Sequence, residues 1–239
     1  MTALASKRPA RSERPLFVAA AITVAVLVFI GFSRTFYLRG VFGGPPLSGL
    51  LVLHGIVMTM WIVVFIAQIA LVAAGRTDLH RGLGVAGALV AMSIVFVGFS
   101  AGIDAGRRGF SPSPQVTPVA FMAVPLIDVL VFATLIVAAL VNRRRPATHK
   151  RLMLLATLGI LTPAIARLPI DAMKQAGLPA FFGVTVFCVV VVVLFDTVRN
   201  RRLHPAFAWG AAFLIASIPF RILLSQTDAW ASLARWMIG

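Results

Sequence analysis

The sequence predicts an all-α, polytopic transmembrane helical bundle of about seven spans, and three observations lead to this class. Apolar residues make up 60% of the 239-residue chain and charged residues only 12%, whereas soluble domains are about half apolar. The apolar residues form long runs, each close to the roughly 20 residues that a helix needs to cross a bilayer. These runs lack the period-2 alternation of transmembrane strands, which excludes a barrel.

Seven segments meet the length requirement, and the fifth and seventh are the weakest because Arg167 and Arg221 interrupt them. We therefore divide the chain into a basic N-terminal tail (1–14), one transmembrane domain (15–226) and a C-terminal segment (227–239). In that last segment, a cap at Thr227-Asp228 and apolar residues at helical spacing predict a short helix on the outer interface. The predicted spans are 15–33, 48–74, 82–103, 119–142, 151–172, 178–198 and 206–226.

Lys and Arg are distributed unequally over the two sides of these spans. With the N-terminus inside, the inner segments hold fourteen of the 22 and the outer segments six, while Arg167 and Arg221 lie within spans. Positive residues accumulate in cytoplasmic loops, so the count predicts an N-in, C-out orientation. The six outer residues are Arg34, Arg39, Arg107, Arg108, Lys174 and Arg235.

The formal net charge of +15 would indicate a nucleic-acid partner in a soluble protein. Here the arginines lie in short loops between apolar runs, where they set topology and meet anionic lipid. We therefore expect a multi-pass protein of the bacterial cytoplasmic (inner) membrane, with anionic lipids at its cytoplasmic face and no nucleic acid. The single cysteine, Cys188, excludes an intrachain disulfide and a metal–thiolate cluster, and no metal site is expected.

Ionisable residues inside spans are costly, and each one is a functional hypothesis. Such residues occur in the second, fourth, fifth and seventh spans, all within the predicted outer leaflet, and Asp128 is expected to be the only deep carboxylate. Three of them follow a proline within four residues, and a proline frees a carbonyl that lipid cannot satisfy. The sequence thus predicts a polar, outward-opening ligand pocket, with an internal salt bridge as the structural alternative. Its residues are His54, Asp128, Arg167 and Arg221, with Asp171 near the rim.

Three other histidines, His80, His149 and His204, lie in inner loops close to the starts of spans. Two histidines at one depth on facing helices are the usual axial ligands of a b-type haem. His80 and His149 have a common predicted level, and His204 is a substitute for either. The structural alternative is that interfacial histidines contact lipid phosphates or loop carbonyls.

Two stretches carry a resemblance to known membrane proteins. They run from Leu53-His54-Gly55 through Trp61 and Gln68 to His80-Arg81-Gly82-Leu83-Gly84, and over His149-Lys150-Arg151-Leu152-Met153. The chain resembles a group of bacterial polytopic inner-membrane proteins. More distantly it is similar to transmembrane b-type cytochromes and to membrane proteins that assist haem-copper oxidase assembly. The resemblance implies at most one haem b, because only the inner histidine set is present.

Three functional hypotheses follow from these patterns. The first is a haem-binding redox or oxidase-assembly role that uses the inner histidines. The second is binding or carriage of a small anionic or lipidic ligand through the outer pocket. The third is a non-catalytic accessory subunit, with a membrane-protein partner or a homo-oligomer. Motifs of metalloproteases, serine hydrolases and nucleotide-binding loops are not found, and no lysine lies within a span to form a retinal Schiff base.

Overall fold

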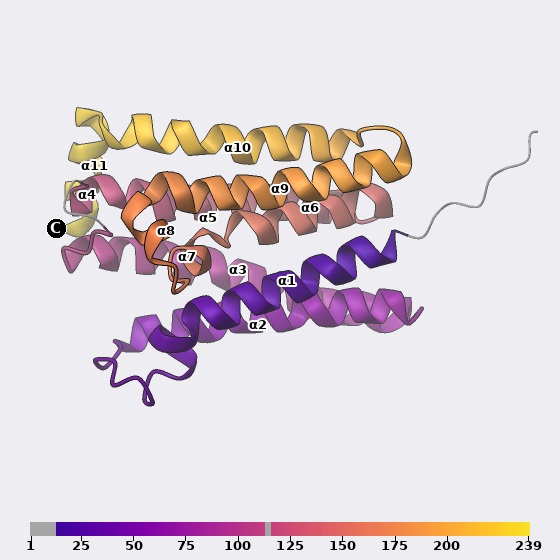
Figure 1. Ribbon diagram of the computed structural model, residues 1–239, viewed down its shortest axis with the longest axis horizontal. Helices are drawn as coiled ribbons and strands as arrows, with labels where there is room; N and C mark the ends of the chain where they lie inside the picture. Colours follow the sequence, from indigo (N-terminus) through magenta and orange to yellow (C-terminus); the bar gives the residue numbers. More distant parts are fainter. Residues whose placement is uncertain (1–12, 113–115) are drawn as a thin grey trace, which may run out of the picture.

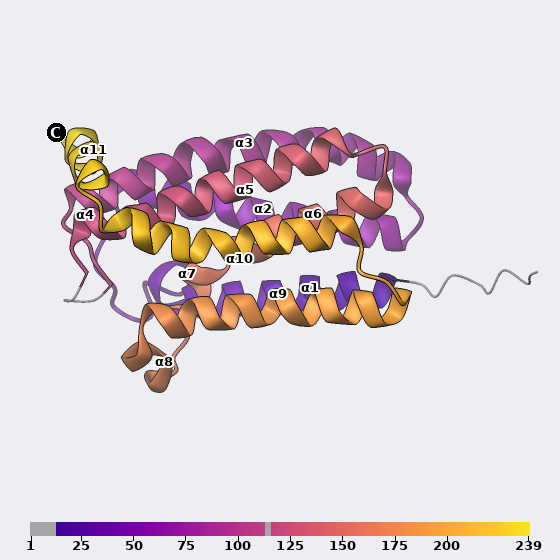
Figure 2. The same ribbon diagram turned by 90° about the horizontal axis from the view of Figure 1, so that it is seen from above.

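The computed structural model describes residues 13–112 and 116–239, which are helical apart from turns and loops. Residues 1–12 of the predicted N-terminal tail lie outside the described residues. The long helices lie side by side along one axis (Figure 1, Figure 2). The prediction of a multi-span, all-α membrane protein is confirmed, because six helical segments are long and apolar enough to cross a membrane.

The six segments match six of the seven predicted spans. The first is α1 (Arg14–Phe32), continued by the π-helical turn η1 (Ser33–Tyr37), and the fourth is a short α4 followed by α5. Within the fourth segment the helix breaks at Met122, three residues before Pro125, whose ring nitrogen has no hydrogen to donate to an earlier carbonyl. The bounds of the others are α2 (Gly49–Ala73), α3 (Thr77–Arg107), α4 (Pro118–Phe121), α5 (Ala123–Val141), α9 (Leu178–Asn200) and α10 (Pro205–Ser225).

The predicted fifth span, 151–172, differs from the structure because it is not one continuous helix. It contains most of α6 (Pro146–Gly159), the single turn α7 (Thr162–Ile165) and the start of α8 (Asp171–Ala176). In a continuous helix the nitrogen of residue 163 would donate to the carbonyl of Gly159, and proline cannot make that bond. The helix therefore ends at Gly159, and the chain continues through α7 and α8 to α9.

The connections of the bundle gather at two ends. The start of α1 and the α2–α3, α5–α6 and α9–α10 turns share one end, on the right of Figure 1. We call it the basic end, because its turns and adjoining helix ends carry Arg76, Arg81, Arg143, Arg144, Arg145, Lys150, Arg151, Arg199, Arg201 and Arg202. The α1–α2 loop, α4, α8 and α11 (Asp228–Ile238) lie toward the opposite end.

Helix α6, which ends at Gly159, is enclosed by three neighbouring helices. It packs against α5, α9 and α10, and Leu152, Leu154, Leu155 and Ala156 are fully buried. Lipid cannot satisfy the polar backbone that a helix break exposes, whereas neighbouring protein can. Enclosure of α6 is therefore what allows this segment, and not a peripheral one, to end its helix early.

The C-terminal residues form α11, which lies across the end of the bundle (Figure 2). Thr227 caps the helix by accepting a hydrogen bond from the Trp230 backbone nitrogen at 3.1 Å. The Trp230 indole donates to the Val119 carbonyl at 2.9 Å, and Arg107 donates to the carbonyls of Met237 and Ile238. These bonds join α11 to α3 and to the α4 segment.

Helix α1 comes close to the backbone of α7 at Gly31. A Cβ atom at Gly31 would lie 2.2 Å from the Ala164 carbonyl oxygen, which belongs to the backbone and cannot rotate away. We expect Gly31→Ala to lower the free energy of unfolding in detergent by about 1–3 kcal/mol. Gly82→Ala is the matched control, because a Cβ there meets no atom within 4 Å. Equal unfolding free energies for the two variants would contradict the packing.

Candidate functional site

Two of the three predicted inner histidines come together at the basic end. The imidazole rings of His80, in the first turn of α3, and His149, in the first turn of α6, lie edge to face with their centroids 6.5 Å apart. The Nδ1 atom of His149 is 2.9 Å from the Ala139 carbonyl oxygen. If that nitrogen carries the proton, the hydrogen bond sets the tautomer and leaves Nε2 as a metal-ligating or accepting atom.

Two polar atoms near this pair are buried without a hydrogen-bond partner among the described residues. They are Nδ1 of His80 and Oε1 of Gln68 on α2. Gly84, one turn after His80, lies beside the Gln68 amide, where a Cβ atom would be in ordinary contact with Nε2 at 3.7 Å. Buried polar atoms are nearly always satisfied in folded proteins. Two such atoms in the same region therefore mark a place where a further polar group or a metal would bind favourably.

The third histidine, His204, has a different environment. Its Nδ1 atom accepts a hydrogen bond from the Ala206 backbone nitrogen at 3.1 Å and caps α10. Partial burial and the positive charge of Arg151 lower the pKa of His204. His204 therefore belongs with the charged cluster around Arg151 and has a structural role in capping α10.

Arg151 is the centre of a buried charge cluster that the sequence analysis missed. Its guanidinium donates to both carboxylate oxygens of Asp196 on α9, at 3.0 and 2.6 Å, and to Oε1 of Glu13 at 2.7 Å. It also donates to the Ala147 carbonyl at 2.8 Å and lies over the Phe207 ring of α10. The cluster therefore connects α6, α9, α10 and the residue preceding α1.

The carboxylate of Glu13 is held ionised by its partners. Partial burial raises the pKa of Glu13, but hydrogen bonds and charge from Lys150 and Arg151 outweigh it and lower the pKa to about 2. The Asp196 side chain is fully buried and also accepts a bond from Asn200 at 3.1 Å. The expectation that Asp128 is the only deep carboxylate is thus wrong. The signal was present, because Asp196 lies inside the predicted span 178–198.

The residues of the predicted outer pocket do not form one group. Asp128 on α5 and Arg221 on α10 form an ion pair, and only 11% and 3% of their side chains are exposed. Arg221 is held further by Ser217, through Nε to the carbonyl at 3.0 Å and Nη2 to Oγ at 2.7 Å, and it lies over the Phe182 ring. This pair is the internal salt bridge of the structural alternative, and its two charges neutralise each other.

The other three residues of the predicted pocket lie elsewhere. Arg167 donates to the Pro163 carbonyl at 2.8 Å and lies over the Phe32 ring of α1. His54 on α2 is half-buried and experiences the positive charge of Arg167. Asp171 is exposed and pairs with Lys174 at 3.0 Å. Among the described residues Arg167 has no carboxylate partner, so its charge is not neutralised by an ion pair.

Two hollows at the surface of the described part of the chain border neither the predicted pocket residues nor the histidine pair. One, of about 440 Å³, is lined by residues of η1, the α1–α2 loop and the start of α2. The other, of about 490 Å³, lies on the apolar face of α9. No group of three or more His, Cys, Asp or Glu side chains suited to a metal ion occurs among residues 13–112 and 116–239.

Comparisons with known proteins found no match to a family model, to a curated protein or to a solved structure. The site is therefore interpreted from its own geometry.

The Asp128–Arg221 pair generates a stability prediction. Asp128→Asn leaves the Arg221 guanidinium buried without its counter-ion, so we expect the free energy of unfolding to fall by about 3–5 kcal/mol. The measurement is equilibrium unfolding of the purified protein in detergent. Asp171→Asn is the matched control, because its pair with Lys174 is exposed and contributes little. Unchanged stability of Asp128→Asn would show that the pair does not hold α5 to α10.

Proposed function

We propose that the protein binds one b-type haem through His80 and His149 at the basic end, and that it has a redox or oxidase-assembly role. The observation that carries the proposal is the approach of these two rings from separate helices, α3 and α6. They are 69 residues apart in sequence, by the difference of their numbers, and they are brought to one level by the folding of the bundle. A pair of facing histidines is the usual axial ligand set of haem b.

Three features of the two histidines support this proposal. With metal–nitrogen bonds of about 2 Å, two axial imidazoles have ring centroids roughly 6 Å apart, which is close to the 6.5 Å between His80 and His149. The bond from His149 Nδ1 to Ala139 is the kind of outer contact that orients a ligating imidazole. The unsatisfied Nδ1 of His80 is the atom that a ligand or metal would complete.

Helices α3 and α6, which carry the two rings, are held together through a third helix. Helix α5 packs against both α3 and α6, whereas α3 and α6 are not extensively packed against each other. A bound haem would supply one-electron transfer, and its potential would be set by the histidine ligands and by burial. His80 and His149 would hold the iron, and Gln68 would offer one polar contact beside them.

We also propose that the basic end faces the cytoplasm of a bacterial inner membrane. Its cluster of arginines matches the bias of cytoplasmic loops, and the opposite end carries fewer basic residues. In this orientation the haem site lies in the cytoplasmic leaflet and α11 lies at the outer interface. Anionic lipids of the cytoplasmic leaflet are the expected neighbours of the basic end.

Haem ligation predicts an absorption signature. The protein purified from haem-supplied cells should show a Soret band, with sharpened α and β bands on dithionite reduction. We expect His80→Ala and His149→Ala each to remove that signature, because each deletes one axial ligand. His204→Asn is the control and should keep the spectrum, since asparagine also caps helices. A protein without a Soret band after incubation with excess haem would rule out the proposal.

The proposed orientation predicts the labelling of engineered cysteines. In a Cys188→Ser background, Gln226→Cys at the end opposite the basic end should react with a membrane-impermeant maleimide in spheroplasts, whose inner membrane is intact. Arg144→Cys at the basic end should react only after the membrane is permeabilised, and both positions are exposed. Labelling in the reverse pattern would place the basic end outside.

A further inference from the structure

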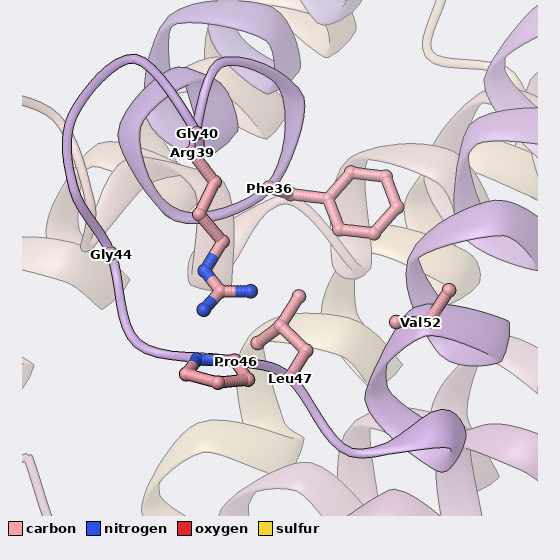
Figure 3. A pocket seen from close by; sticks show the side chains of 7 residues that line it. All are labelled: Phe36, Arg39, Gly40, Gly44, Pro46, Leu47 and Val52. Carbon is pink, nitrogen blue, oxygen red and sulfur yellow. The ribbon is translucent and has the colours of Figure 1, made fainter.

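The α1–α2 connection lines the hollow of about 440 Å³ at the end opposite the basic end. Figure 3 shows the Arg39 guanidinium pointing into this hollow, between the loop and the side chains of Pro46 and Leu47. Phe36 of η1 and Val52 of α2 form its other side. The hollow thus combines one cation with a lining that is otherwise mainly apolar. Its volume lies within the range of small-molecule binding sites.

The hollow is shaped by two close approaches to glycine. Phe36 packs against Gly55 of α2, where a Cβ atom would lie 2.2 Å from the ring. The stem of Arg39 passes Gly44, where a Cβ would lie 2.8 Å from Cγ and 3.0 Å from Nε. Any larger residue at Gly44 would displace the arginine. The sequence of this loop therefore positions the guanidinium over the hollow.

The charge of Arg39 is not neutralised within the described part of the chain. Its side chain has no ion pair there, and no carboxylate lines the hollow. Of the acidic residues toward this end, Asp104 is bonded to Arg108 at 2.7 Å and Asp171 is bonded to Lys174. A planar guanidinium without a carboxylate is suited to an anion with paired oxygens, and phosphate is the common biological example.

We propose that this hollow binds a phosphate ester through Arg39, and that the ester is the headgroup of a phospholipid. The apolar lining of Phe36, Leu47 and Val52 favours a ligand with an apolar body over a bare anion. The hollow is open and lies between the end of one candidate membrane span, Arg14–Tyr37, and the start of the next, Gly49–Ala73. The ends of spans are the level at which lipid headgroups are expected. The proposal is independent of haem binding, which concerns the opposite end.

The test uses phosphatidylglycerol that carries a photoreactive group close to its phosphate, with the full-length protein in mixed micelles. After illumination, the cross-linked peptides are mapped by mass spectrometry. We expect cross-links within residues 36–52, and Arg39→Gln should reduce their yield about tenfold, since a charge-assisted contact is lost. Cross-links at the basic end should be unchanged, and they report that each variant is folded and lipid-bound.

Two matched variants separate the site from general charge. Arg34→Gln removes the same charge from the same end, but Arg34 lies over the Phe42 ring and does not line the hollow. It should keep the cross-links. Gly44→Ala keeps the charge but displaces Arg39, so it should reduce the yield, whereas Gly49→Ala should not, because a Cβ at Gly49 meets no atom within 4 Å.

Competition identifies the source of the phosphate. Unlabelled phosphatidylglycerol should displace the probe, and inorganic phosphate at the same concentration should not. Equal displacement by inorganic phosphate would overturn the lipid assignment and leave a site for a free anion. Equal losses for Arg39→Gln and Arg34→Gln would overturn the site itself, because the effect would then be one of net charge.

Discussion

The rest of the bundle depends on the ion pairs and hydrogen bonds that the buried guanidinium of Arg151 makes. A charge this far from water is stable only if its hydrogen-bonding groups are used, and its bonds reach Asp196, Glu13 and the Ala147 carbonyl. It thereby fixes the rotation and depth of α6 relative to α1 and α9. His149 lies two residues before Arg151 on the same helix. The position of one proposed haem ligand is thus set by a charge cluster on the other side of α6.

The enclosure of α6 explains the break at Gly159 and Pro163 and the position of the polar groups that follow it. In this region the Thr162 and Thr185 hydroxyls bond to each other at 2.9 Å, so neither is left unsatisfied. The Asp128–Arg221 ion pair joins α5 to α10. Thr162, Thr185, Asp128 and Arg221 thus all have a polar partner on another helix. These bonds act as specific connections where lipid provides no hydrophobic drive between helices.

Sequence reasoning recovered the helical class and six of the spans because bilayer thickness imposes a length that can be counted. It also placed His80 and His149 at one level, because basic loops and helix starts are readable signals. The pairing of Arg151 with Asp196 was not predicted, since a positive residue at a predicted loop boundary looks like a topology signal. Whether it faces lipid or a carboxylate depends on helix rotation. Helix rotation also separates Arg167 from Asp128, although both lie at similar predicted depths.

Some cations of the bundle are paired with carboxylates and others are not, and this difference carries functional information. At the basic end Lys150 pairs with Glu13, and Arg151 pairs with the buried carboxylate of Asp196. Toward the opposite end, Arg39 and Arg167 have no carboxylate partner in the described part of the chain, and Arg167 is held against an aromatic ring. A structural cation gains most from an internal partner. A cation kept unpaired beside apolar side chains retains its full attraction for a ligand, which is the arrangement expected where an anionic group binds from outside the chain.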